Sequence, residues 1–105
     1  MARVLAISTD LLLGSKVEAM LRAAGHEVTL APSLPEQLEN VDLIVADLDT
    51  DDPQALANLH VPVLGYYSHV NVETKKASEA AGIALAVPRS RMARELPKLT
   101  TKLLT

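Results

Sequence analysis

The sequence predicts an α/β domain in which five parallel strands form a sheet with helices on both faces. Short apolar runs recur along the chain, as expected for strands that are buried on both faces of a parallel sheet. Segments with helical periodicity lie between these runs, and this alternation is typical of βαβ units. With 105 residues, the chain is long enough for one domain with one hydrophobic core, spanning residues 1–105.

The N-terminal part predicts a strand, a helix and a second strand. Arg3–Ser8 is an apolar run that suits a buried strand. The helix that follows carries apolar residues at helical spacing from Leu13 to Ala24. Gly25 marks its end, because glycine readily adopts the left-handed conformation that closes a helix. His26–Leu30 is the second strand.

Prolines shorten the second and third helices. Pro32 and Pro35 leave room only for a short helix around Pro35–Glu39, because proline is excluded from helix interiors. The third strand is Asp42–Asp47. Pro53–Leu59 allows one or two turns of helix, since proline suits the first helical position.

The C-terminal part continues the same alternation. The predicted elements are a fourth strand Val61–Tyr66, a helix Val72–Ala81, a fifth strand Ile83–Val87, and a last helix capped by Ser90 with Met92, Leu96, Leu99 and Leu103 on one stripe. The order of all these elements predicts a flavodoxin-like, doubly wound fold.

The composition excludes several classes of function. There is no cysteine, so we expect no disulfide and no thiolate metal site. There is no Trp or Phe, and the two Tyr are too few for stacking on nucleic-acid bases. The three histidines lack metal-ligand spacing. No run reaches the length of a membrane span, and the N-terminus lacks a signal-peptide cleavage pattern, so we expect a cytoplasmic protein without membrane contact.

Charge is distributed unevenly along the chain. Residues 1–52 carry a net charge of −7, and residues 89–105 carry +4. Arg91, Arg94 and Lys98 give the last predicted helix a basic surface. Such a surface suits an acidic protein partner or the acidic half of a second copy. The chain has no recognised DNA-binding motif, which argues against nucleic acid as the partner.

An acidic cluster follows the third predicted strand, where Asp47 and Asp49 begin a run that continues with Asp51 and Asp52. Asp10 follows the first strand in the same way. Ligands of open α/β sheets bind beyond the carboxyl ends of the strands. Two interpretations stay open. The aspartates cap turns and helices, or they help to bind a cation, an anion or a small molecule at this edge together with Ser8, Thr9 and Ser68.

Three stretches resemble the receiver (CheY-like) domains of bacterial response regulators. DLIVADL is similar to their third strand, whose last aspartate accepts a phosphoryl group, and the resemblance places Asp47 there. HVPVLGYYSH resembles the fourth strand, which ends in a phosphate-contacting Ser or Thr; Tyr67 falls at this position and Ser68 follows it. AGIALAVPRS resembles the stretch that leads to the family's Lys-Pro pair, where this chain has Arg89 and Ser90. The resemblance implies the strand order 2-1-3-4-5.

The departures from this family predict a degenerate pseudo-receiver. Receivers end their first strand in an acidic pair that holds Mg²⁺, whereas this chain has Ser8 and Thr9, with only Asp10 acidic. Arg89 is longer than the lysine that it replaces and has a planar fork. We therefore expect a non-enzymatic signalling and protein-interaction module without a cofactor. Mg²⁺ would be needed only if Asp47 is a working phosphoacceptor, with Asp10 as a second ligand.

The resemblance also implies a surface for partners. Receiver-like domains pair through the fourth helix, fifth strand and fifth helix, which predicts a homodimer or a protein partner on this face. Tyr66 and Tyr67, together with His69, are expected to form a partly exposed contact patch there, since tyrosine is enriched at interfaces.

Overall fold

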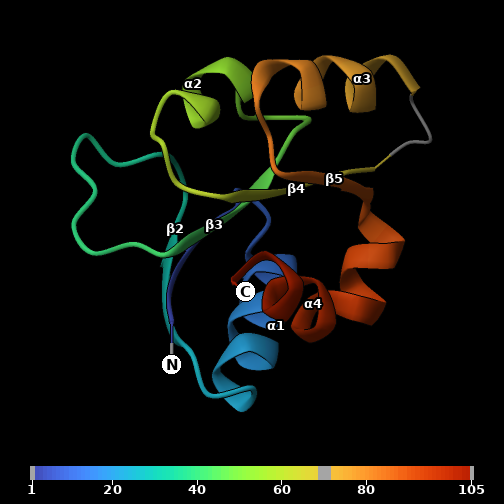
Figure 1. Ribbon diagram of the computed structural model, residues 1–105. Helices are drawn as coiled ribbons and strands as arrows, with labels where there is room; N and C mark the ends of the chain where they lie inside the picture. The colour runs from blue at the N-terminus through green and yellow to red at the C-terminus, as the bar shows by residue number, and fades with distance from the viewer. Residues whose placement is uncertain (1, 69–71, 105) are drawn as a thin grey trace.

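A computed structural model describes residues 2–68 and 72–104 and contains a five-stranded parallel sheet with helices on both faces (Figure 1). The elements in chain order are β1 (Arg3–Ile7), α1 (Leu11–Ala23), β2 (Glu27–Ala31), β3 (Leu43–Asp47), α2 (Pro53–Ala57), β4 (Val63–Tyr67), α3 (Val72–Ala81), β5 (Leu85–Pro88) and α4 (Arg89–Leu104). The strand order is β2-β1-β3-β4-β5, and every neighbouring pair is parallel. The predicted fold class and strand order are confirmed.

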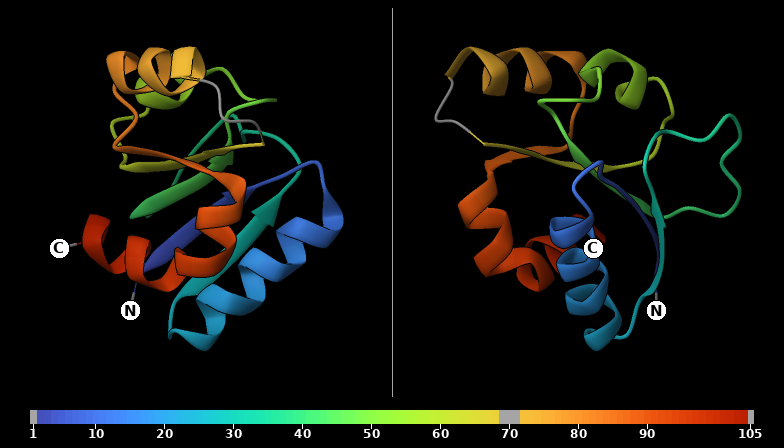
Figure 2. Two further views of the ribbon diagram at one scale, coloured as in Figure 1. Left: turned by 90° about the vertical axis from the view of Figure 1, so that its right-hand side faces the viewer. Right: turned by 180° about the vertical axis from the view of Figure 1, so that it is seen from behind.

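The sheet separates two hydrophobic clusters. Helices α1 and α4 lie on one face, and α2 and α3 lie on the other (Figures 1 and 2). Successive strand residues point to opposite faces. Ile44 of β3 therefore belongs to the cluster under α2, and Val45 belongs to the cluster under α1 and α4. Both side chains are buried, as the unbroken apolar run predicts.

The short helix expected around Pro35–Glu39 does not form. The whole segment between β2 and β3 is a loop, which projects from the sheet in Figure 1. Leu34, Leu38 and Val41 still pack against the cluster under α2. A segment of this length must meet the full cost of helix nucleation, and its prolines cannot donate backbone hydrogen bonds. Contacts of these apolar side chains therefore hold the segment against the sheet as a loop, without a helix.

The remaining predicted helices are present with small differences at their ends. The third predicted helix is short, as expected, and is α2. The last begins at Arg89, so Ser90 lies in its first turn and does not precede it. Because one expected helix is missing, the predicted partner face corresponds to α3, β5 and α4. Among the described residues, no helix is long and apolar enough to cross a membrane.

Candidate functional site

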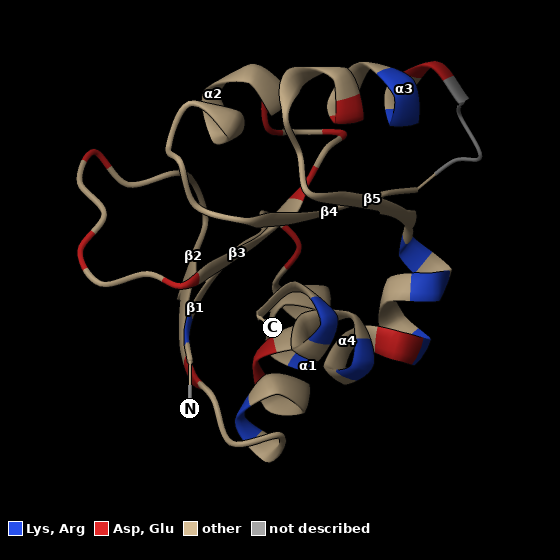
Figure 3. Cartoon of the chain, in the orientation of Figure 1, with Lys and Arg blue, Asp and Glu red and all other residues tan. Residues whose placement is uncertain are grey.

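Polar side chains gather at the carboxyl ends of β1, β3, β4 and β5, which we call the carboxyl edge. Sheet register brings them together. Ile7 pairs with Ala46, Asp47 with Tyr66, and Tyr67 with Pro88, so neighbouring strands end at similar heights. The edge is defined by five side chains predicted from the sequence, namely Asp10, Asp47, Asp49, Ser68 and Arg89. Figure 3 shows acidic segments at the end of β3 and at the start of α1.

Asp10 is bonded through both carboxylate oxygens. Its Oδ1 accepts hydrogen bonds from the backbone N–H groups of Leu12 (3.0 Å) and Leu13 (3.2 Å), which makes Asp10 the N-cap of α1. Its Oδ2 accepts a hydrogen bond from Nη2 of Arg89 at 2.6 Å. The Leu13 hydrogen bond and then the Arg89 hydrogen bond lower the pKa of Asp10 below its ordinary value. Asp10 is therefore an ionised carboxylate engaged by protein donors.

Ser8 has a structural role in the turn that leads to α1. Its buried hydroxyl donates to the carbonyl of Asp10 at 3.0 Å and accepts from the Asp10 N–H at 3.1 Å. These bonds close the strand-to-helix turn and fix the position of the Asp10 cap. Ser8 therefore stabilises the turn that positions Asp10.

Asp47 lies at the end of β3 and is partly buried. Its Oδ1 accepts a hydrogen bond from the Asp49 N–H at 2.8 Å. Burial is the main cause that raises the pKa of Asp47, and the nearby charge of Asp49 adds to it, against the lowering effect of the Asp49 hydrogen bond. Asp47 therefore lies at the carboxyl edge, with one carboxylate oxygen bonded to the backbone that follows β3.

Asp49 connects the ends of β3 and β4. Its Oδ2 accepts hydrogen bonds from the backbone N–H of Ser68 (2.8 Å) and from the Ser68 hydroxyl (2.6 Å). The side chain expected to contact a phosphoryl group is thus bonded to the chain's own carboxylate.

Asp51 carries a buried carboxylate oxygen, Oδ2, that has no hydrogen-bond partner among the described residues. Burial, followed by the charge of Asp47, raises the pKa of Asp51 above its ordinary value of 3.8. Folding therefore favours the protonated form. Across the window from 3.8 up to the raised pKa, the folded chain binds more protons than the unfolded chain, and stability falls as the pH rises.

We expect the substitution Asp51→Asn to raise the free energy of unfolding at neutral pH, because it removes a charge that folding partly desolvates. Below the ordinary pKa of 3.8, Asp51 is protonated in both states, so the gain should disappear. Urea unfolding followed by circular dichroism at both pH values measures the difference. Equal stability of the two proteins at neutral pH would contradict the prediction.

The predicted magnesium ligands do not fit this ion as they are arranged. Mg²⁺ needs carboxylate oxygens in near-octahedral geometry. Both oxygens of Asp10 already accept hydrogen bonds, one of them from a cation. Over residues 2–68 and 72–104, no three His, Asp or Glu side chains form a group suited to a metal ion.

The prediction of an exposed tyrosine patch is wrong. Tyr66 is 1% exposed and Tyr67 is 5% exposed, and they point into the clusters on opposite faces of the sheet. A central parallel strand is covered on both faces, so even its last residues are buried. Burial raises the pKa of Tyr66, although a hydrogen bond with Ser8 acts in the opposite direction. His69 lies outside the described residues.

The last helix carries the basic surface predicted from the sequence. Arg91, Arg94 and Lys98 are exposed on α4, opposite its buried apolar stripe, and Figure 3 shows several blue segments along this helix. Arg91 pairs with Glu95 of the same helix at 3.2 Å. Arg91, Arg94 and Lys98 follow one another at intervals of three and four residues, so they share one helix face. We call these three residues the basic stripe.

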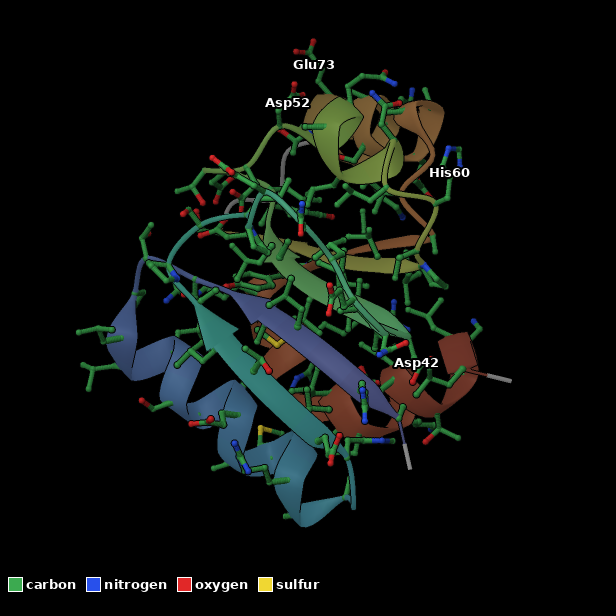
Figure 4. All side chains as sticks on the ribbon, turned by 90° about the vertical axis from the view of Figure 1, so that its left-hand side faces the viewer. Asp42, Asp52, His60 and Glu73 are labelled. Atoms are coloured by element: carbon green, nitrogen blue, oxygen red, sulfur yellow. The ribbon has the colours of Figure 1, made fainter. Side chains whose placement is uncertain are left out.

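The acidic half of the sequence does not form one surface. Figure 4 shows Asp52 and Asp42 at opposite ends of the domain. Asp52 caps α2 by accepting from the Gln54 N–H at 3.1 Å, and Asp42 accepts from the Arg3 N–H at 2.9 Å. Asp52, like Asp10, therefore caps a helix, whereas Asp42 joins the starts of β1 and β3.

Two features of the edge were missed by sequence reasoning. Leu11 and Leu12, in the first turn of α1, are 75% and 87% exposed. Three consecutive leucines cannot all face one side of a helix, so this exposure had a sequence signal. The Arg89–Asp10 pair had none, since its members lie 79 residues apart.

No family model matches this chain, and no curated protein matches its sequence. Solved structures do match. The chemotaxis protein CheY4 of Vibrio cholerae has a TM-score of 0.85 and 23% identity, with 99% of each chain covered. The receiver domain of a Francisella response regulator has a TM-score of 0.86 and 19% identity, with 99% of this chain and 97% of that chain covered. A response regulator from Thermotoga maritima has a TM-score of 0.85 and 16% identity, with 99% and 98% covered. Over its whole length, the chain has the fold of response-regulator receiver domains.

Proposed function

We propose that this chain is a degenerate receiver-like domain, a non-enzymatic signalling and protein-interaction module that works in the cytoplasm without Mg²⁺ or phosphotransfer. The observation that carries the proposal is the 2.6 Å bond between Arg89 and Asp10. This bond engages Asp10, the acidic residue that follows β1. In the family that the sequence resembles, the end of the first strand supplies the acidic pair that binds the metal ion.

Phosphoryl transfer to a carboxylate brings two negative groups together, so it depends on cations that neutralise the transferred group. At this edge the cation is Arg89, and it is already paired with Asp10. The hydroxyl of Ser68 is bonded to Asp49. The two groups that would assist transfer to Asp47 are thus each bonded to another carboxylate of the edge, which supports a scaffold role.

The partner surface that we propose is the face formed by α3, β5 and α4, with the basic stripe at its side. Exposed cations on one helix face attract an acidic protein surface and raise the rate of encounter. An acidic partner protein suits this stripe best. A second copy paired through α3, β5 and α4 is the other partner proposed.

The proposal predicts the response of amide NMR spectra to Mg²⁺ and then to beryllofluoride, which mimics a phosphoryl group on aspartate. We expect no saturable shifts at Asp47, Ser68 and Arg89 up to millimolar additions, because their side chains keep their present partners. The matched control is Asp47→Asn, which should behave like the unaltered chain.

Saturable shifts that vanish in Asp47→Asn would contradict the proposal and make Asp47 a working phosphoacceptor.

Spectra of the same protein at several concentrations test whether a second copy is the partner. Concentration-dependent shifts confined to α3, β5 and α4 would identify a second copy as the partner, whereas concentration-independent spectra favour an acidic protein of another kind.

A further inference from the structure

We infer that Arg89 is the resident cation of the carboxyl edge: its guanidinium holds Asp10, ties α1 to α4, and keeps divalent cations from the carboxylates of Asp10 and Asp47. This inference concerns the same carboxyl edge as the proposed function. It rests on the proposed function in one respect, namely that the domain works without a metal ion at this edge. It can fail separately, as the experiment below shows.

The position of Arg89 follows from the fold. Arg89 is the first residue of α4, directly after β5, and Asp10 directly precedes α1. Both helices lie on the same face of the sheet and contact each other (Figure 2). The Nη2–Oδ2 distance of 2.6 Å is that of a strong charge-assisted hydrogen bond. A pair that spans 79 residues of sequence therefore joins the first and last helices at the edge.

Arg89 is bonded to Asp10, and Asp47 ends β3, the strand that pairs with β1, so both carboxylates that a divalent ion would need lie at the edge that Arg89 occupies. Arg89 stabilises the ionised form of Asp10 through the hydrogen bond, and its field also lowers the pKa of Asp47, against the larger effect of burial. Lys16, six residues after Asp10 on α1, is exposed. It lines the groove between α1 and α4 together with Arg89, so both helices contribute a positive charge to this groove.

A tethered guanidinium competes well against a free ion. It is always charged, it has five donors in a fixed fork, and it is present at a high effective concentration because the backbone holds it. The side chains of Arg89 and Asp10 are 38% and 45% exposed, and partly exposed ion pairs contribute little to folding stability. Removing Arg89 should therefore leave the fold intact while freeing the Oδ2 atom of Asp10.

The test uses Mn²⁺, a paramagnetic ion that shares with Mg²⁺ a preference for oxygen ligands. Amide line broadening is followed in the unaltered chain, in Arg89→Gln and in Arg91→Gln. Arg91 is the matched control, since it is two residues further along α4 and pairs with Glu95 instead of the edge. A fourth protein combines Arg89→Gln with Asp10→Asn, because asparagine keeps the helix cap but not the charge.

We expect Arg89→Gln to bind Mn²⁺ at least about tenfold more tightly than the unaltered chain, with broadening around Asp10 and Asp47. Arg91→Gln should match the unaltered chain, and the double variant should lose the gain. If Arg89→Gln does not fold, Arg89→Met provides the same comparison.

Equal Mn²⁺ affinity in Arg89→Gln and the unaltered chain would overturn the inference, as would an equal gain in Arg91→Gln. These outcomes differ from failure of the proposed function. If the unaltered chain responds to beryllofluoride, the proposed function fails, and the role of Arg89 is still decided by the ratio of affinities. If the unaltered chain is silent and Arg89→Gln gains nothing, only the inference fails.

Discussion

Replacing Tyr66 with alanine should lower the free energy of unfolding by about 3–5 kcal/mol, the usual cost of removing a large buried aromatic side chain. The ring belongs to the cluster under α1 and α4 and is 1% exposed, so its loss leaves a cavity in the core. Small domains are stable by about 5–15 kcal/mol, so this variant should lose a large part of its stability.

Urea unfolding of Tyr66→Ala, followed by circular dichroism, measures this loss, and Tyr66→Phe is the control. Phenylalanine keeps the ring and removes only the hydroxyl that interacts with Ser8, so we expect a loss of about 1 kcal/mol. If Tyr66→Ala costs no more than Tyr66→Phe, the ring does not fill the core, and the exposed position first expected for it would be correct.

Replacing Gly65 with alanine should destabilise the domain by about 1–3 kcal/mol through overpacking. A Cβ atom at this position would lie 2.6 Å from Cδ1 and 2.7 Å from Cγ of Leu48. Leu48 is buried and belongs to the cluster under α2, so its side chain has little room to move away. Leu48 also follows Asp47 directly, so we expect the amide signals of Asp47 and Asp49 to shift.

The control for Gly65→Ala is a double-mutant cycle with Leu48→Ala. The smaller side chain removes the atoms that the new Cβ would meet, so Gly65→Ala should cost much less in that background. If Gly65→Ala lowers the free energy of unfolding equally in the two backgrounds, a clash with the Leu48 side chain is not the cause of the destabilisation. The unfolding free energies of all four proteins complete the measurement.

Much of the fold could be predicted because the relevant patterns are local. The apolar run before Asp47 identifies a strand buried on both faces, and the same kind of run recurs in β1 and β4. Parallel strands bring their carboxyl ends to one edge, so the positions of Asp10, Asp47 and Asp49 followed from the order of the elements. The helix predicted around Pro35–Glu39 was wrong because a few apolar contacts hold this segment in place as a loop.

The sequence by itself determined the α/β architecture, the acidic edge after β3 and the basic stripe of α4, since each depends on residue types at short spacing. Only the tertiary structure decided that Tyr66 and Tyr67 are buried, and that Arg89 is bonded to Asp10. The physical reason is that the burial of a side chain and its hydrogen-bond partners depend on which elements become neighbours. α1 and α4 meet on one face of the sheet although they lie at opposite ends of the chain, and no local pattern records that contact.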